Sequence, residues 1–224
     1  MSTKTDLGHD VYKRFANFGV ASIYEASNKN GLIDLDLKQI IPTSRIAGPA
    51  RTLLLSSGGN RSVHEVMKYI LPGEILAISM ESPVPLALIG ELLALQAQKA
   101  QVAGILINGA VRDTDAIREL GLPIWSRWIS ARAAAKDEIG QMNVPITLGG
   151  VKIMPGDTII LDGDGGVVIP KNRVDMVLAT AEQNYLKEMG TKKSIIKGEY
   201  TYDLYGFSKS GHSLKDSITT KLSD

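Results

Sequence analysis

The stretch from Gly90 to Leu93 can bind an anion. It follows two prolines that cannot lie inside a helix, and it opens an apolar run with helical composition. A helix that begins here leaves the backbone N–H groups of Glu91, Leu92 and Leu93 without partners, with the positive end of the helix dipole behind them. These groups predict a site for a carboxylate or a phosphate.

An arginine and an aspartate follow the next predicted strand. Residues 102–107 are a short apolar run, VAGILI, with the length and composition of a buried strand, and Asn108 and Gly109 mark a turn after it. A strand that follows a helix in a layered unit runs antiparallel to it, so its carboxyl end returns toward the start of the helix. We therefore expect Arg112 and Asp113 to reach the pocket of the Gly90 amides.

Each of these residues also has a purely structural interpretation. Asp113 precedes a predicted short helix at 114–120 and has the right chemistry for its N-cap. Arg112 has the chemistry of a surface or interface salt bridge. Glu91 lies in a first helical turn, where a negative charge is favourable by roughly 0.3 to 1 kcal/mol. Residue type and position leave these alternatives open.

The spacing of these groups resembles that of a known family. An acid at Glu91, twenty intervening residues and the Arg112-Asp113 pair, within GELLA and GAVRD, are similar to the HMG/CHA aldolases, which act on 4-hydroxy-4-methyl-2-oxoglutarate and 4-carboxy-4-hydroxy-2-oxoadipate. The wider group includes the RraA-like proteins. The resemblance runs from about residue 20 to about residue 206, through IAGPART, GLPIWSR and PGDTIILDGDGGVVIP. Asn108 departs from it, because many relatives carry Asp there; we expect an effect on the turn only.

The resemblance implies roles for the residues of this stretch. Asp113 is then the direct protein ligand of a divalent metal, Mg²⁺ or Mn²⁺, which accept oxygen ligands and retain water. Arg112 stabilises an enolate that forms from a 2-keto group. Glu91 holds a metal-bound or catalytic water. The amides from Gly90 to Leu93 bind the pyruvyl carboxylate of the substrate.

Two further acids are assigned to the site by resemblance. Glu25 is also the fourth residue of a capping box, Ser22-Ile23-Tyr24-Glu25, that predicts a second helix ending before Gly31. Glu188 lies near the end of a long helix predicted over residues 172–189 and has the alternative of a solvated helix charge. The resemblance implies that both reach into the site of an adjacent subunit.

Composition excludes several classes of protein. The 224 residues include no cysteine, which excludes disulfides, thiolate zinc sites and a cysteine nucleophile. A net charge of +1 provides no basic field for nucleic acid. The first ten residues lack the apolar core of a signal peptide, and no apolar run approaches about 18 residues. We expect a cytoplasmic protein without a membrane partner.

The order of predicted elements indicates an α/β protein. Helices and strands alternate in the first half, whereas short strands separated by Gly, Pro and Asp turns follow from Pro145. Residues 162–166, DGDGG, are predicted to form a turn, because an EF-hand would need Glu where Arg173 stands. The resemblance implies a layered α/β/β sandwich with a swivelling β/β/α-like topology. We expect one domain over 1–190 and an extension over 191–224 that packs on a neighbouring subunit of a trimer or hexamer.

The predicted function is that of a class II pyruvate aldolase. It would cleave 4-hydroxy-2-oxo acids to pyruvate and a keto acid, with oxaloacetate decarboxylation as a side activity. The alternative is a non-enzymatic regulator of the RraA type that binds a ribonuclease, and a quinone methyltransferase is disfavoured because no glycine-rich cofactor loop is present. The histidines show no metal-ligand spacing, and Lys99, Lys136 and Lys152 fall in no stretch with a predicted pocket.

Overall fold

A computed structural model describes residues 8–56, 58–137 and 139–209 of the chain. Its contacts divide the chain into two compact units, Met1–Ala181 and Glu182–Asp224. The first unit contains the sheet and, with the exception of Glu188, the residues predicted to do chemistry. No helix among the described residues has the length and apolar character needed to cross a lipid bilayer.

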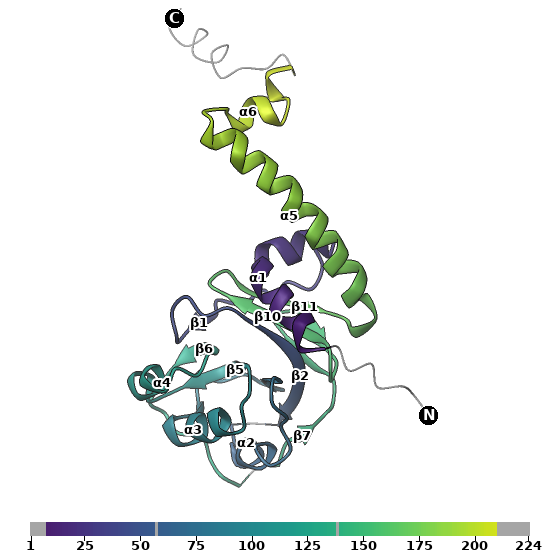
Figure 1. Ribbon diagram of the computed structural model, residues 1–224. Coiled ribbons are helices and arrows are strands. Elements are labelled where there is room, and N and C mark those ends of the chain that lie inside the picture. The colour runs from purple at the N-terminus through teal and green to yellow at the C-terminus, as the bar shows by residue number, and fades with distance from the viewer. Residues whose placement is uncertain (1–7, 57, 138, 210–224) are drawn as a thin grey trace, which may run out of the picture. The chain divides into compact units, whose positions relative to one another are not determined.

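A nine-stranded mixed sheet forms the framework of the first unit (Figure 1). Its main path runs in the order β1-β6-β5-β3-β2-β10-β11, with β4 paired to β5 and β7 paired to β2. The strands are β1 (Lys38–Gln39), β2 (Ile46–Leu55), β3 (Ile75–Met80), β4 (Ala87–Ile89), β5 (Gly104–Val111), β6 (Ile124–Ile129), β7 (Gln141–Met142), β10 (Thr158–Asp162) and β11 (Gly165–Ile169). A separate hairpin consists of β8 (Ile146–Leu148) and β9 (Val151–Ile153).

The central strands are parallel and buried on both faces. β2, β3, β5 and β6 pair in parallel, and every residue of β3 and β5 is buried. Because successive side chains of a strand point to opposite faces, Ile105 and Ile107 enter one core cluster and Leu106 enters another. Continuous apolar runs such as GILI are therefore required here, where an exposed strand would alternate with polar residues.

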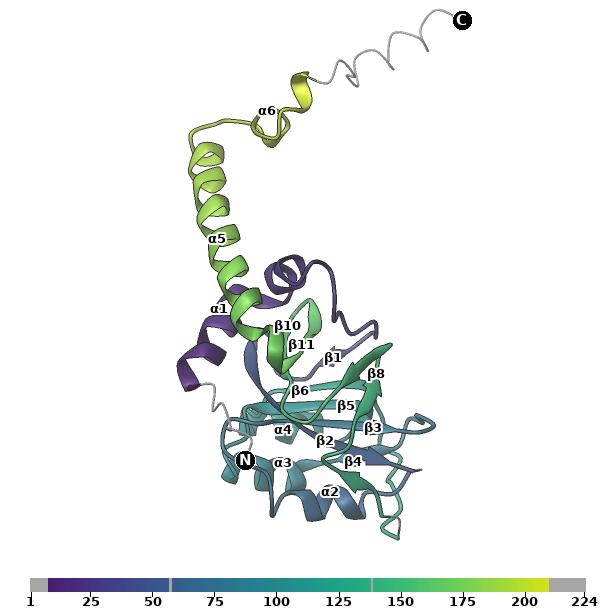
Figure 2. The ribbon, with the colours of Figure 1, turned by 90° about the vertical axis from the view of Figure 1, so that its right-hand side faces the viewer.

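Three helices cover one face of this sheet. They are α2 (Arg61–Val66), α3 (Glu91–Lys99) and α4 (Thr114–Leu120), and their apolar side chains join those of β3 and β5 in one core cluster. The β8–β9 hairpin lies over the opposite face (Figure 2), where Trp125 is completely buried. The predicted α/β/β layering is confirmed.

The kinked helix α1 packs on β10 and β11. It spans His9–Ala26, and its backbone leaves the helical region at Gly19, which has φ 81° and ψ 171°. The buried carboxylate of Asp162 accepts a hydrogen bond from the Val20 amide at 2.9 Å, and a side chain at Gly19 would collide with it. Gly19 therefore divides α1 into two helical halves.

The capping box predicted at Ser22–Glu25 is wrong. The second half of α1 follows directly from Gly19, so Ser22 lies inside the helix, and the cap is supplied by a carboxylate 142 residues away. Side-chain capping satisfies an orphan amide from any element that can reach it. Sequence spacing could not identify Asp162 as the acceptor of this hydrogen bond.

The second half of the first unit is β-rich, as predicted. β8–β9 and β10–β11 are antiparallel hairpins, and Asp162 pairs with Gly165 across the turn that was predicted at 162–166. After the 3₁₀ turn η1 (Lys171–Arg173), helix α5 runs over Val174–Ile196, farther than the predicted end at residue 189. Its buried residues all lie between Val174 and Ala181.

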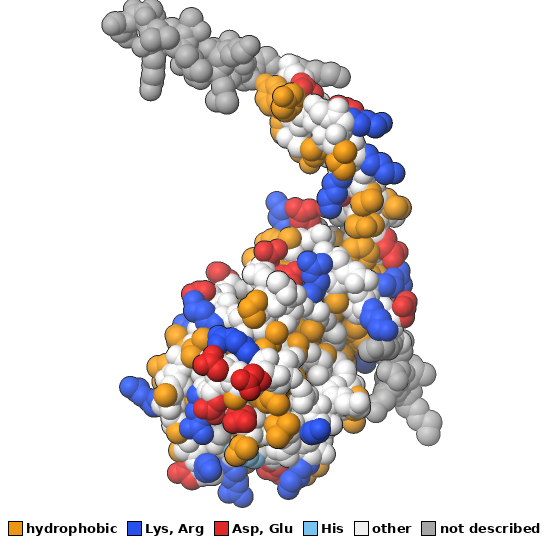
Figure 3. Space-filling view, turned by 60° about the vertical axis from the view of Figure 1, so that its left-hand side comes forward, with side chains coloured by type: hydrophobic (Ala, Val, Ile, Leu, Met, Phe, Trp, Pro, Cys, Tyr) orange, Lys and Arg blue, Asp and Glu red, His pale blue; other side chains and the backbone are white. Residues whose placement is uncertain are grey.

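The second unit starts inside α5, at Glu182. It continues through α6 (Thr201–Leu204) and η2 (Phe207–Lys209), and residues 210–224 of the predicted extension lie outside the described part. Leu186 is 71% exposed, Ile196 85% and Tyr200 75%. Figure 3 shows hydrophobic side chains along the surface of this unit.

Candidate functional site

Parallel pairing of β4 with β5 brings the chemical groups together. Ile89 of β4 pairs with Val111 of β5, and the Arg112 amide donates to the Ile89 carbonyl at 3.0 Å. The residues that follow these partners, Gly90 and Arg112, are therefore neighbours. The predicted convergence of the α3 start with the loop after β5 is confirmed. Strand β4, which enforces it, was not predicted.

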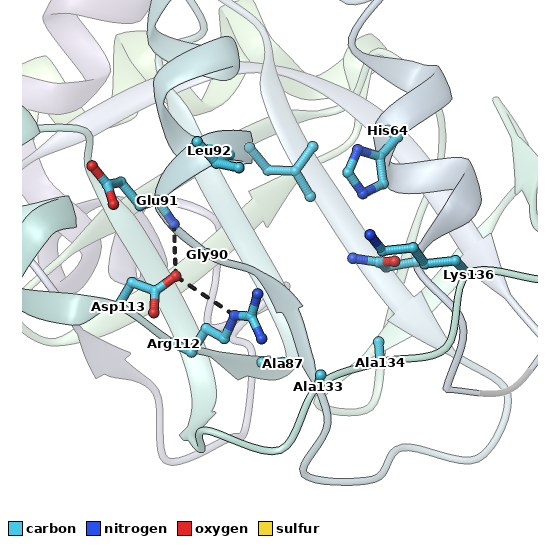
Figure 4. A pocket seen from close by; sticks show the side chains of 12 residues that line it. His64, Ala87, Gly90, Glu91, Leu92, Arg112, Asp113, Ala133, Ala134 and Lys136 are labelled. Carbon is cyan, nitrogen blue, oxygen red and sulfur yellow. Dashed lines mark hydrogen bonds and ion pairs between the residues drawn. The ribbon is translucent and has the colours of Figure 1, made fainter.

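The Asp113 carboxylate accepts a hydrogen bond from the start of α3 and none from the start of α4. Asp113 occupies the N-cap position of α4, but its side chain makes no cap hydrogen bond there. Its Oδ2 accepts from the Glu91 amide at 3.1 Å (Figure 4). The backbone adopts the left-handed region, φ 57° and ψ 38°, which Asp tolerates better than most residues. The structural interpretation of Asp113 as the side-chain cap of α4 is therefore wrong.

Arg112 lies against Asp113 and opens to solvent. Its Nε is 3.5 Å from Asp113 Oδ2, and the two side chains are 45% and 44% exposed. An ion pair at this distance and exposure contributes little to folding. The arginine therefore remains available to an anionic ligand, and Figure 4 shows its guanidinium on the side that faces His64 and Lys136.

These residues line a cavity of about 410 Å³. Its lining also includes two residues at the start of α2 and three in the loop after β6, and of these His64 and Lys136 lie across the cavity from Asp113 (Figure 4). The lining residues are Asn60, His64, Ala87, Gly90, Glu91, Leu92, Leu93, Arg112, Asp113, Ala133, Ala134 and Lys136.

Lys136 and His64 belong to this cavity. The expectation that Lys136 lies in no pocket is wrong, since Lys136 lines this cavity. The backbone amide of Asn60 donates to the Ala135 carbonyl at 2.8 Å, and the Ala135 amide donates to the Gly58 carbonyl at 3.2 Å. These bonds join the loop after β6 to the start of α2. In the sequence, Gly58-Gly59-Asn60 indicates a turn before α2, but it does not indicate that this turn bonds the loop after β6.

The side-chain oxygen of Asn60 is a hydrogen-bond acceptor without a donor among the described residues. The Asn60 Nδ2 donates to the Leu88 carbonyl at 3.2 Å, which fixes the orientation of the amide. The Oδ1 atom is buried and has no hydrogen-bond partner among the described residues. An unsatisfied buried acceptor is costly, so a ligand hydroxyl or a water is the expected partner.

The start of α3 offers two free amides. Within the described part of the chain, the N–H groups of Leu92 and Leu93 have no acceptor, whereas that of Glu91 is bound by Asp113 and that of Ala94 by the Gly90 carbonyl. Both lie beside the cavity. Of the predicted amide set, these two remain available to a carboxylate.

Asp113 suits a cation that needs few protein ligands. Its Oδ2 is held by Glu91, while Oδ1 contacts no protein donor in the described ranges and the side chain remains half-exposed. The described residues contain no cluster of three or more His, Asp or Glu side chains suited to a metal ion. One carboxylate oxygen with water as the remaining ligand is an arrangement that Mg²⁺ accepts.

The predicted acids lie in different places. Glu91 is exposed at the start of α3, with its carboxylate on the Asp113 side and away from His64 and Lys136 (Figure 4). Glu25 is exposed on α1 and is not among the lining residues, and Glu188 is exposed in the second unit. The arrangement within the first unit thus joins Arg112, Asp113, Glu91 and two amides.

Comparisons with known proteins agree with this arrangement. The family described as RraA-like, Aldolase/RraA, matches residues 20–168. A protein of Halalkalibacterium halodurans provisionally named as a 4-hydroxy-4-methyl-2-oxoglutarate aldolase is 34% identical over 83% of this chain and 89% of its own length. A Thermus thermophilus 4-hydroxy-4-methyl-2-oxoglutarate aldolase is 31% identical over 57% of this chain and 77% of its own.

Solved structures include proteins with a different assigned role. Streptomyces coelicolor RraAS2, titled an unusual member of an RNase ES inhibitor family, superposes with a TM-score of 0.75 at 23% identity, over 83% of this chain and 96% of its own. The RNA-processing inhibitor RraA from a Thermus species superposes with a TM-score of 0.62 at 27% identity, over 67% and 91%. The fold is therefore shared by both kinds of protein.

Proposed function

Because this chain belongs to the RraA-like family of aldolases and RraA proteins, we propose that it is a divalent-metal-dependent pyruvate aldolase. Its substrates would be 4-hydroxy-2-oxo acids such as 4-hydroxy-4-methyl-2-oxoglutarate and 4-carboxy-4-hydroxy-2-oxoadipate. The observation that carries the proposal is one cavity bordered by Arg112, Asp113 and the free amides of α3. A keto acid bound in this cavity would have the Leu92 and Leu93 amides on one side and the Arg112 guanidinium on another as donors to its negative charge.

The protein groups would divide the work along the substrate. The Leu92 and Leu93 amides would bind the C1 carboxylate. Mg²⁺ or Mn²⁺ held by Asp113 would supply a Lewis acid that polarises the 2-keto oxygen. Arg112 would hold the negative charge that develops on this oxygen as the C3–C4 bond breaks, because its guanidinium borders the same cavity beside Asp113.

Proton transfer would use water and carboxylates. Glu91 would hold the water that accepts the 4-hydroxyl proton, while the electrons of the C3–C4 bond enter the pyruvate enolate. Protonation of the enolate at C3 gives pyruvate, and the 4-hydroxyl carbon becomes the new carbonyl. The same enolate arises when oxaloacetate loses CO₂, so we propose that activity too. Glu25 and Glu188 would assist from neighbouring subunits.

The opposite end of the cavity suits a second carboxylate. Lys136 and His64 lie across the cavity from Asp113. The Lys136 ammonium and a His64 N–H can donate to an anion, and Asn60 Oδ1 can accept from a hydroxyl. A 4-hydroxy-2-oxo acid with a carboxylate beyond C4 matches this order of groups.

The assembly and location belong to the same proposal. We propose a homotrimer or homohexamer in the cytoplasm, with sites at subunit interfaces and without nucleic-acid or membrane partners. The exposed apolar side chains of the second unit, among them Leu186, Ile196 and Tyr200, support association.

A coupled assay tests the activity. Pyruvate release from 4-hydroxy-4-methyl-2-oxoglutarate or oxaloacetate is followed with lactate dehydrogenase and NADH. We expect activity with Mg²⁺ or Mn²⁺ that EDTA abolishes, and Arg112→Ala should lower kcat by about 100-fold or more, because one preorganised charge stabiliser is removed. Arg132→Ala, an exposed arginine that is not a lining residue, is the control. Activity that survives EDTA would reject the metal mechanism.

The runner-up is a regulator of RNA processing, which the similarity to the RNA-processing inhibitor RraA of a Thermus species favours. It predicts capture of a ribonuclease by the full chain and no release of pyruvate. Capture that persists in Arg112→Ala, together with no turnover of any 4-hydroxy-2-oxo acid by the natural sequence, would favour this second function.

A further inference from the structure

Gly90 is packed against both of the groups that the proposed reaction uses. A Cβ atom built on it would lie 3.0 Å from Arg112 Nε and 3.2 Å from Arg112 Cγ, and it would overlap Asp113 Oδ2. Figure 4 shows Gly90 between the backbone that leads to Glu91 and these two side chains. Any residue other than glycine would therefore occupy the place of the carboxylate.

Backbone conformation does not require glycine at this position. Gly90 has φ −131° and ψ −170°, an extended conformation open to any residue. Its place at the N-cap of α3 does not require glycine either, since Ser, Asn and Asp are preferred N-caps and would satisfy the free amides of the helix. The reason for glycine at this position is therefore the space that a side chain would take from Asp113 and Arg112.

We propose that Gly90 is a positioning residue that keeps the Asp113 carboxylate turned toward a divalent cation. This inference rests on the proposed function, in which Asp113 is the protein ligand. The absence of a Cβ lets Asp113 Oδ2 approach the Glu91 amide, and that hydrogen bond leaves Oδ1 directed away from the protein donors. Loss of an outer contact that orients a metal ligand typically weakens metal binding about 10- to 100-fold.

The consequence of adding a methyl group is local. Asp113 Oδ2 is the end of a short, half-exposed side chain, so it would swing away while the helix stays in place. The Gly90 carbonyl would still accept the Ala94 amide at 3.0 Å, and the pairing of Ile89 with Val111 would be unchanged. The bond from the Glu91 amide, the contact of Oδ2 with Arg112 Nε and the direction of Oδ1 would be lost.

The test measures cation binding separately from catalysis. Mn²⁺ is titrated into the full chain, and free Mn²⁺ is followed by electron paramagnetic resonance for the natural sequence, Gly90→Ala, Asp113→Ala and Gly8→Ala. Gly8 is the matched control, because it is the N-cap of α1 and has no atom within 4 Å of a built Cβ. We expect Gly90→Ala to bind Mn²⁺ about tenfold or more weakly, Gly8→Ala to bind it normally, and Asp113→Ala to show no specific binding.

The outcomes separate the two proposals. If the natural sequence binds Mn²⁺ and Asp113→Ala does not, but Gly90→Ala binds normally, this inference fails and the proposed metal site stands. If the natural sequence does not bind Mn²⁺, or Asp113→Ala binds it normally, the proposed metal site fails and the inference fails with it. Thermal melts are compared as well: a variant Gly90→Ala that unfolds well below Gly8→Ala overturns the inference, because the helix rather than the carboxylate would have moved.

Discussion

At the scale of single residues, the cavity separates its charges between two ends. Asp113 and Glu91 lie at one end, Lys136 and His64 at the other, and Arg112 extends between them (Figure 4). A substrate with two carboxylates can place one at the α3 amides and the other near Lys136. We therefore expect Lys136 to affect the preference for substrates with a second carboxylate more than it affects the rate of bond cleavage.

Replacement of Lys136 by Ala should reduce selectivity. We expect kcat/KM for 4-hydroxy-4-methyl-2-oxoglutarate to fall about tenfold or more, the effect of losing one charged hydrogen bond, and that for a 4-hydroxy-2-oxo acid without a distal carboxylate to change little. Steady-state kinetics on both substrates measure this. Lys99→Ala, an exposed lysine on α3 that does not line the cavity, serves as the control. An equal loss on both substrates would count against a distal carboxylate at Lys136.

At the scale of elements, pairing between strands decides where the functional groups meet. The β4–β5 pair sets the α3 start beside the loop after β5, and the contact between Asn60 and Ala135 draws the loop after β6 to the same cavity. Helix α1 follows the same logic, because its second half is capped by Asp162 from β10. The start of α3 and the start of the second half of α1 thus take acceptors from residues 22 and 142 positions away.

The cap at Asp162 should be important for stability. Asp162→Ala removes the acceptor for the Val20 and Asp164 amides, both at 2.9 Å, and leaves the amide of buried Val20 unpaired. We expect a loss of about 1 to 3 kcal/mol in the free energy of unfolding, measured by urea denaturation. Asp164→Ala in the same turn, where the side chain is exposed, should change it by less than about 0.5 kcal/mol. Equal losses would show that the cap contributes nothing.

At the scale of the whole molecule, the second unit exposes apolar surface that its own elements do not cover. Leu186, Ile196 and Tyr200 are each more than two-thirds exposed. Exposed apolar surface of this kind marks an interface in soluble proteins. The proposed roles of Glu25 and Glu188 in neighbouring sites depend on such an assembly.

Sedimentation should detect this assembly. We expect the natural sequence to sediment as three or six copies of the 24.1 kDa chain, and Leu186→Glu with Ile196→Glu to shift it toward the monomer, because both charges would be buried at a contact. Lys192→Glu, an exposed change on the same helix, should leave the mass unchanged. A monomeric natural sequence would remove the basis for cross-subunit acids.

The sequence by itself determined which segments are buried and where helices begin. The continuous apolar run at 102–107 predicted β5, and the apolar run after Gly90 predicted α3. The type and spacing of Glu91, Arg112 and Asp113 also identified the candidate site. These features could be predicted because periodicity and helix signals act over a few neighbouring residues.

Only the tertiary structure decided which partner each polar group takes. Asp113 bonds the amide of Glu91 instead of capping its own helix, Asp162 replaces the predicted capping box, and Lys136 joins the cavity from a loop without a signal. The physical reason is that these contacts join residues 22 to 142 positions apart, and the order in which strands pair brings them together. A local pattern thus predicts which amides and carboxylates require a hydrogen-bond partner, and the pairing of strands determines which distant group provides it.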